Sequence, residues 1–190
     1  MQNKTLSLTV ISLFASLTSI GAFIKIPLPV VPFTLQVLFV FLAGCLLGRK
    51  NGMMSQLLYV GIGLIGVPVF ASGGGPEYIL KPTFGYLIGF IVAAYVIGYI
   101  VETNKEPKLK QFIFANVIGL FIVYIFGIIY LYVSLNTWLD SPISIKGVLM
   151  MGLVYSIVQD LILAFFGGLL AIRLYSYFSK ARNSEKKAAA

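Results

Sequence analysis

The sequence contains no histidine and a single cysteine among its 190 residues. Histidine is the commonest general base and metal ligand near neutral pH, so its absence removes the usual starting point for catalysis. The lone Cys45 cannot form an internal disulfide, and its apolar surroundings predict a small buried side chain. Since paired carboxylates and a serine or cysteine nucleophile with a base are also lacking, the sequence disfavours an enzyme and predicts no metal site and no cofactor.

Charged residues are scarce as well, at 11% of the chain, with 6 acidic residues against 14 lysines and arginines. Hydrophobic residues make up 59%, and the mean hydropathy is +0.97. A soluble domain of this length could not bury so much apolar surface, which predicts solvation by membrane lipid. The net charge is +8. We expect these cations to lie beside the ends of membrane spans and to interact with anionic lipid, and we expect no nucleic-acid partner.

Six apolar stretches separate when the sequence is divided at its charged residues. They cover residues 5–24, 33–48, 53–70, 82–101, 112–133 and 147–172. Each approaches the ~20 residues that a helix needs to cross a bilayer. The sequence therefore predicts an all-α membrane protein, a compact bundle of six transmembrane helices forming one domain over residues 1–180, followed by a disordered cytoplasmic tail over residues 181–190. The first stretch is expected to be a retained helix rather than a signal peptide, because no cleavage site precedes a soluble domain.

The cations are distributed unevenly between the loops that join these stretches. The N-terminus, the second-to-third loop, the fourth-to-fifth loop and the C-terminal tail together hold 11 of the 14 lysines and arginines. The other three loops hold only Lys25, Lys81 and Lys146. Because cytoplasmic loops are enriched in lysine and arginine, both termini are predicted to be cytoplasmic. A site for an external ligand should then be built from the three outer loops.

The first outer loop is apolar but rich in proline. Its three prolines, within residues 27–32, cannot continue a helix. An apolar, non-helical segment at membrane depth is tolerated where it is buried in protein or lines a cavity. Thr34 and Gln36 then bring polar groups to the start of the second stretch. A connector without a role in ligand binding remains the alternative.

The second outer loop contains the triple glycine Gly73–Gly75, followed by Tyr78 and Lys81. Such a run lets the backbone approach a ligand closely and expose its N–H groups. It is not a phosphate loop, since the sequence has no G-x-x-x-x-G-K-[ST] pattern. A flexible hinge is the alternative interpretation.

Asp160 is the only ionisable residue deep in any apolar stretch, and Ser156 and Gln159 flank it. A carboxylate within the membrane costs several kcal/mol, so it usually faces an interior cavity and has a partner there. Two alternatives stay open: a protonated aspartate that only links helices, and a proton site.

Together these elements predict a largely apolar pocket with a few polar anchors. The aspartate would accept N–H donors and a lysine would hold a carboxylate, so the expected ligand is apolar with N–H groups at one end and an acid at the other. The candidate ligand-binding residues are Thr34, Gln36, Phe70, Gly73, Gly74, Tyr78, Lys81, Thr83, Tyr86 and Asp160.

The first stretch presents small residues at helical spacing. Ser12 and Ser16 lie one turn apart, as do Ala15 and Ser19. In lipid, such a face lets another helix approach closely. Packing against a neighbouring span and docking of a partner protein are both consistent with this pattern.

Several motifs resemble the BioY family, the biotin-binding S components of energy-coupling-factor transporters. They are PFTLQ at residues 32–36, a Gly-x-x-x-Gly pattern leading to Leu58-Tyr59, GxxGxPVF at residues 63–70, the glycines of residues 73–75 and PTxGYLxGF at residues 82–90. The match is strongest over residues 10–95 and weaker through the sixth stretch. The family pattern has proline-glycine before the aspartate and lysine three residues after it, whereas this sequence has Val158-Gln159 and Leu163. Lys81 is then the candidate partner for a ligand carboxylate.

The resemblance implies a six-helix, multi-pass protein of the bacterial cell membrane that binds biotin from outside. It also implies a transmembrane coupling protein and two cytoplasmic ATPases as partners, with the coupling protein docked on the small-residue face of the first helix. An autonomous proton-coupled transporter of biotin or another small vitamin, using Asp160, is the alternative function.

Overall fold

The computed structural model describes residues 2–26, 31–104 and 106–188, and it is built almost entirely from helices. The long helices are α1 (Gln2–Phe23), α2 (Gln36–Leu64), α3 (Phe84–Glu102), α4 (Leu109–Thr137) and α6 (Ile157–Ala188). Five segments of the described residues are long and apolar enough to cross a membrane. The prediction of an all-α, multi-pass membrane protein is thereby confirmed.

Shorter elements connect these helices. They are β1 (Lys25–Ile26), β2 (Phe33–Thr34), the 3-10 helix η1 (Pro76–Leu80), α5 (Ile145–Leu149) and the π-helical segment η2 (Met150–Val154). Strand β1 pairs with β2 in antiparallel register, Lys25 opposite Thr34 and Ile26 opposite Phe33. The proline-rich segment is thus non-helical at both of its described ends, while positions 27–30 lie outside the described residues.

Helix α2 contains two limbs, because the backbone of Gly48 is non-helical at φ 77° and ψ 180°. A Cβ atom added to Gly52 would lie 2.9 Å from the carbonyl oxygen of Ala43. Residues nine apart in a straight helix are separated by about 13 Å, so the limbs on either side of Gly48 must fold back on each other. Gly44 is closely packed as well, since a Cβ atom added there would lie 2.7 Å from the side chain of Ile97.

Helix boundaries differ from the sequence prediction in three places. The third stretch was expected to run to residue 70, but α2 ends at Leu64, because a proline and several glycines follow and Gly66, Gly73 and Gly75 have positive φ. The sixth stretch is divided into α5, η2 and α6 rather than forming one helix. Helix α6 continues to Ala188, so most of the expected disordered tail is helical; its lysines, alanines and glutamate are good helix formers.

The helices pack chiefly α1 on α2, α2 on α3 and α3 on α4, while α6 crosses both α2 and α4. Bulky side chains that are fully buried include Phe41, Tyr59 and Phe112. Cys45 is buried too, and its thiol donates to the Asn116 Oδ1 atom at 3.2 Å. Many other apolar side chains face outward on every long helix, which fits a surface solvated by lipid.

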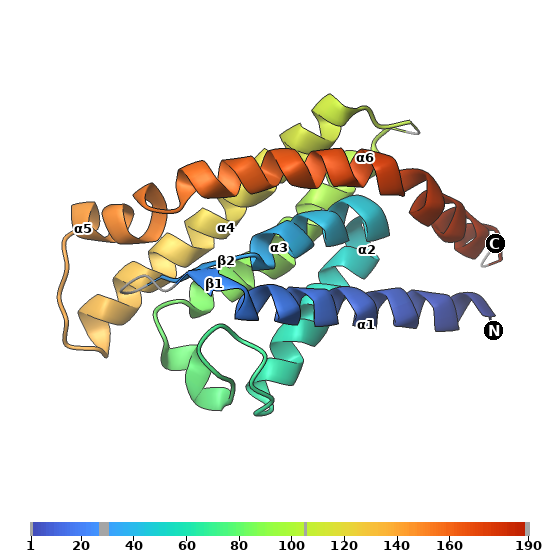
Figure 1. The fold of residues 1–190 in the computed structure, drawn as a ribbon. Helices are drawn as coiled ribbons and strands as arrows, with labels where there is room; N and C mark the ends of the chain where they lie inside the picture. The colour runs from blue at the N-terminus through green and yellow to red at the C-terminus, as the bar shows by residue number, and fades with distance from the viewer. Residues whose placement is uncertain (1, 27–30, 105, 189–190) are drawn as a thin grey trace.

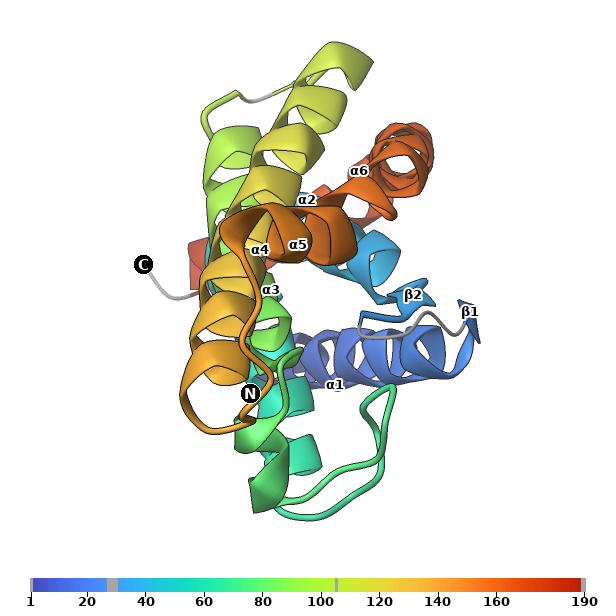
Figure 2. The same cartoon turned by 90° about the vertical axis from the view of Figure 1, so that its left-hand side faces the viewer.

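The start of α1 and the end of α6 lie at the same end of the molecule, and α5 lies at the opposite end (Figure 1). Figure 2 looks at the molecule from the α5 end. In both views the paired strands β1 and β2 lie between α1 and α6. This arrangement brings the first outer loop beside the start of α6.

Candidate ligand-binding pocket

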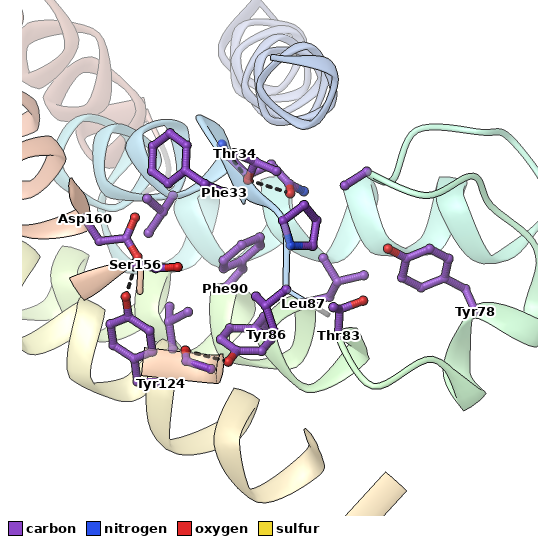
Figure 3. Close-up of a pocket in the computed structure, with 17 residues that line it drawn as sticks. Phe33, Thr34, Tyr78, Thr83, Tyr86, Leu87, Phe90, Tyr124, Ser156 and Asp160 are labelled. Carbon is purple, nitrogen blue, oxygen red and sulfur yellow. Dashed lines mark hydrogen bonds between the residues drawn. The ribbon is translucent and has the colours of Figure 1, made fainter. Parts of the chain in front are cut away.

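A pocket that is partly open to solvent lies between these elements. Its walls come from the β2–α2 connection, the loop before η1, η1 itself, the first turns of α3, the middle of α4, and the η2–α6 connection (Figure 3). The lining residues are Val31, Pro32, Phe33, Thr34, Gln36, Val37, Ala71, Tyr78, Thr83, Tyr86, Leu87, Phe90, Val123, Tyr124, Gly152, Ser156 and Asp160. The mainly apolar lining, which includes a few polar side chains, is typical of a site for a small organic ligand.

Asp160 lies on the wall formed by α6. As expected, it lies near the middle of a candidate membrane span, Ile145–Ser179. Within that span it occupies the first turn of α6, because the π-helical segment η2 precedes this helix. A helix N-terminus favours a negative charge. The Tyr124 hydroxyl of α4 donates a hydrogen bond to the Asp160 Oδ2 atom, and Figure 3 shows both side chains at the pocket edge. The carboxyl group therefore has a partner on one oxygen, and Oδ1 can still accept a donor from a ligand.

Thr34 and Gln36 form a second polar group, on the wall contributed by β2 and α2. The Thr34 hydroxyl donates to Gln36 Oε1 at 2.9 Å, and the Gln36 amide donates to the Tyr59 hydroxyl. Tyr59 in turn donates to the carbonyl of Val69 at 3.3 Å. These side chains satisfy one another, so they hold the start of α2 against the loop that follows it.

The aromatic residues of η1 and α3 close the pocket from a third side. The Tyr86 hydroxyl donates to the carbonyl of Gly152 in η2 at 2.8 Å, and Gly127 gives its ring room, since a Cβ there would lie 2.4 Å from the ring. Tyr78 packs against Phe70, with ring centroids 4.4 Å apart. Burial raises the pKa of the Tyr78 phenol, which therefore stays neutral at physiological pH.

Six of the ten residues proposed from the sequence line this pocket, and four do not. Those in the lining are Thr34, Gln36, Tyr78, Thr83, Tyr86 and Asp160. Of the others, Phe70 is buried behind Tyr78. Gly73 pairs with Phe70 in a short bridge, and Gly74 packs on the carbonyl of Val67. Glycine is needed at these positions for the conformation and close packing of the loop backbone.

Lys81 also lies outside the lining. Its ammonium group donates to the carbonyl of Ser72 at 2.6 Å and lies 4.8 Å from the ring centroid of Tyr78. Lys25 donates to the neighbouring carbonyl, that of Ala71. Two lysines therefore donate to backbone carbonyls of the loop between α2 and η1, next to Ala71 and Tyr78 of the pocket lining.

The small-residue face of α1 is divided between interior and surface. Ala15 is 3% exposed and belongs to the core, so it is not accessible to a partner protein. Ser12 and Ser16 are exposed and Ser19 is half-buried. The four residues predicted as one docking face therefore do not share one environment.

The sequence reasoning missed several lining residues, above all Tyr124, Leu87 and Phe90. Leucine and phenylalanine within apolar stretches carry no signal that separates a pocket wall from a lipid contact. Tyr124 could have been suspected as a partner of Asp160, because a carboxylate in the membrane needs a hydrogen-bond donor and the spans contain few donor side chains other than tyrosine.

The fold and the pocket thus define a multi-pass membrane protein with a partly open, mainly apolar pocket. A model of the BioY family matches residues 1–180. A probable biotin transporter BioY from Lysinibacillus sphaericus is 59% identical over 181 residues, covering 95% of this chain and 92% of that protein. The biotin transporter BioY from Thermotoga maritima is 40% identical over 163 residues, covering 85% of this chain and 91% of its own length.

A solved structure agrees with these sequence relatives. The crystal structure of the S-component for biotin from an ECF-type ABC transporter matches with a TM-score of 0.79 and 26% sequence identity, covering 93% of this chain and 97% of that one. The chain belongs to the BioY family, which confirms the resemblance seen in its motifs.

Proposed function

We propose that this protein is the biotin-binding S component of an energy-coupling-factor transporter and acts without catalysis of its own. The observation that carries the proposal is the pocket, in which one carboxyl group, that of Asp160, lies at the edge of a largely apolar cavity. The family match and the relatives named as biotin transporters support it.

Biotin matches the chemistry of this pocket. Its ureido ring offers two N–H donors, and the free oxygen of Asp160 can accept one of them. Its apolar body suits the wall formed by Leu87, Phe90 and Val123. The ligand carboxylate needs a cation, and Lys81 is our candidate because it lies next to Tyr78 at the α2–η1 loop.

We propose six membrane spans, with α2 contributing two of them, one on each side of Gly48. The eleven cations of the N-terminus, the 49–50 turn, the 105–110 loop and the C-terminal segment would then face the cytoplasm. The common end of the molecule at which α1 begins and α6 ends supports this topology (Figure 1).

We propose that a transmembrane coupling protein and two cytoplasmic ATPases drive transport, and that the coupling protein docks on α1. The exposed pair Ser12 and Ser16 is the accessible part of the predicted face, since Ala15 is buried. Small side chains there would let a partner helix approach closely. Ser16→Trp should then keep biotin binding and lose co-purification with the coupling protein.

The first test is a calorimetric titration of the biotin-depleted protein in detergent with biotin. We expect tight one-to-one binding that weakens by at least about tenfold in Asp160→Asn, which is ~1.4 kcal/mol. Asp140→Asn is the matched control, because Asp140 is an exposed loop aspartate outside the pocket and asparagine tolerates its positive φ. Absence of binding by folded wild-type protein would overturn the biotin assignment.

Uptake into cells separates this proposal from the autonomous, proton-coupled alternative. Uptake that requires the ATPase subunits agrees with an S component. Uptake that persists without them and is abolished by an uncoupler alone would instead assign the protein to the secondary transporters.

A further inference from the structure

Ser156 is a buried pocket residue whose hydroxyl has no hydrogen-bond partner among the residues that the structure describes. The residue is only 5% exposed. A buried hydroxyl without a partner costs free energy, so native structures rarely leave one unpaired without a reason.

The other buried serines and threonines behave differently. Each donates to a carbonyl three or four residues earlier in its own helix: Thr18 to Phe14, Ser55 to Gly52, and Ser134 to Leu131. This is the usual way in which a helix satisfies such a hydroxyl. Ser156 departs from it although it stands at the junction of two helical segments.

Other donors already bind the two carbonyls that the Ser156 hydroxyl would ordinarily use. The carbonyl four residues earlier belongs to Gly152 and accepts the Tyr86 hydroxyl at 2.8 Å. The carbonyl three residues earlier, that of Leu153, accepts the N–H group of Ser156 itself at 3.1 Å. Each of these two carbonyls thus already accepts one donor, and Figure 3 shows the Ser156 hydroxyl directed toward Phe90, into the pocket. Such π-helical irregularities recur at functional sites.

Ser156 and Asp160 lie close together in the lining of the pocket. They lie one helical turn apart, and the N–H group of Asp160 donates to the carbonyl of Ser156 at 2.9 Å. The Tyr124 hydroxyl donates to the Oδ2 atom of Asp160. The Oδ1 atom can then accept a hydrogen bond from a ligand, and the Ser156 hydroxyl can donate one. A neighbouring acceptor and donor match the N–H and C=O groups on one edge of a cyclic urea.

We propose that the Ser156 hydroxyl donates a hydrogen bond to the ureido oxygen of the ligand while Asp160 accepts an adjacent ureido N–H. This inference rests on the proposed function, because it assumes a ligand of the biotin class. It assigns Ser156 as a residue that selects a urea carbonyl, a role that Tyr86 cannot fill while its hydroxyl is bound to Gly152.

The experiment compares biotin with 2-thiobiotin, in which sulfur, a poor hydrogen-bond acceptor, replaces the ureido oxygen. Both ligands are titrated calorimetrically into the wild-type protein and the Ser156→Ala variant. We expect the substitution to weaken biotin binding by about tenfold and 2-thiobiotin binding by less than about twofold. Ser134→Ala is the matched control, since Ser134 is also buried but bonds to its own helix away from the pocket; it should leave both affinities unchanged.

Each outcome has a defined meaning. Equal losses for the two ligands, or no loss for either, would overturn the role of Ser156 and leave the biotin assignment intact. Wild-type protein that is folded and binds neither ligand would overturn the proposed function itself. If Ser156→Ala is not monodisperse in detergent, Ser156→Cys replaces it with the same expectation, because a thiol is a weak donor.

Discussion

Gly98 of α3 packs against the backbone of the turn in α2, and adding one methyl group there should destabilise the fold. A Cβ atom at this position would lie 2.3 Å from the Arg49 nitrogen, 2.4 Å from the Gly48 carbonyl carbon and 2.6 Å from the Arg49 Cα atom. All three are main-chain atoms, so no rotamer change relieves the clash. The two helices must separate by about 1 Å or the turn must deform.

The cost of such overpacking is typically 1–3 kcal/mol, and the upper part of that range is expected because the contacts are backbone. For a chain of this size, about 3 kcal/mol corresponds to a fall of roughly 6–12 °C in melting temperature. Gly98→Ala should therefore lower the apparent melting temperature in detergent by that amount. Gly98 does not line the pocket, so the folded fraction should bind biotin with unchanged affinity.

Gly61→Ala is the matched control. Gly61 lies in the second limb of α2, and no atom would come within 4 Å of an added Cβ. Alanine has a higher helix propensity than glycine by up to ~1 kcal/mol, so this variant should melt at the same or a slightly higher temperature. Equal melting temperatures for Gly98→Ala and the wild type would refute the backbone contact between the turn and α3.

Three further predictions concern the pocket. Tyr86→Phe deletes the hydroxyl that holds Gly152 and should cost about 1 kcal/mol of stability, seen as a fall of about 2–4 °C in melting temperature; an unchanged value would contradict that bond. If Lys81 holds the ligand carboxylate, Lys81→Ala should weaken biotin binding but change biotinamide binding by less than about twofold in parallel titrations; equal effects on the two ligands would exclude that role. Because burial raises the pKa of the Tyr78 phenol, the folded protein holds this proton more tightly than the unfolded chain, so its contribution to stability is complete below about pH 10 and is lost as the pH rises through the folded-state pKa. The melting temperature of Tyr78→Phe should then fall less steeply between about pH 9 and 11 than that of the wild type. An equally steep fall in both proteins would contradict a raised pKa of Tyr78.

The membrane class and the helical architecture followed from the sequence, because apolar stretches near 20 residues have few folded alternatives in lipid. The limits of those stretches were less secure. The chain from Val67 to Phe70 is apolar enough to extend a span, yet a proline and positive-φ glycines end α2 at Leu64. Hydropathy measures affinity for lipid and says little about where a helix ends.

For the candidate site, too, the sequence indicated some features and not others. Asp160 was identified because an ionisable group is conspicuous among apolar residues, and Thr34, Gln36 and Tyr86 because they follow prolines or glycines in the outer loops. Lys81, Gly73 and Gly74 belong to the second outer loop, as Tyr78 does, but they are not among the residues that line the pocket. Proximity along the chain could not distinguish a residue that faces the pocket from one that supports it.

The sequence by itself determined that lipid solvates this chain, that its cations favour one side, and that a single carboxylate lies among apolar residues. These are properties of composition and spacing, which hold whatever the packing. Only the tertiary structure decided that Tyr124 of α4 holds Asp160, that Ala15 is interior, and that the Ser156 hydroxyl has no acceptor in its own helix. Each of those facts depends on which helix lies beside which and on how the backbone turns, and long-range packing of that kind leaves no local mark in the sequence.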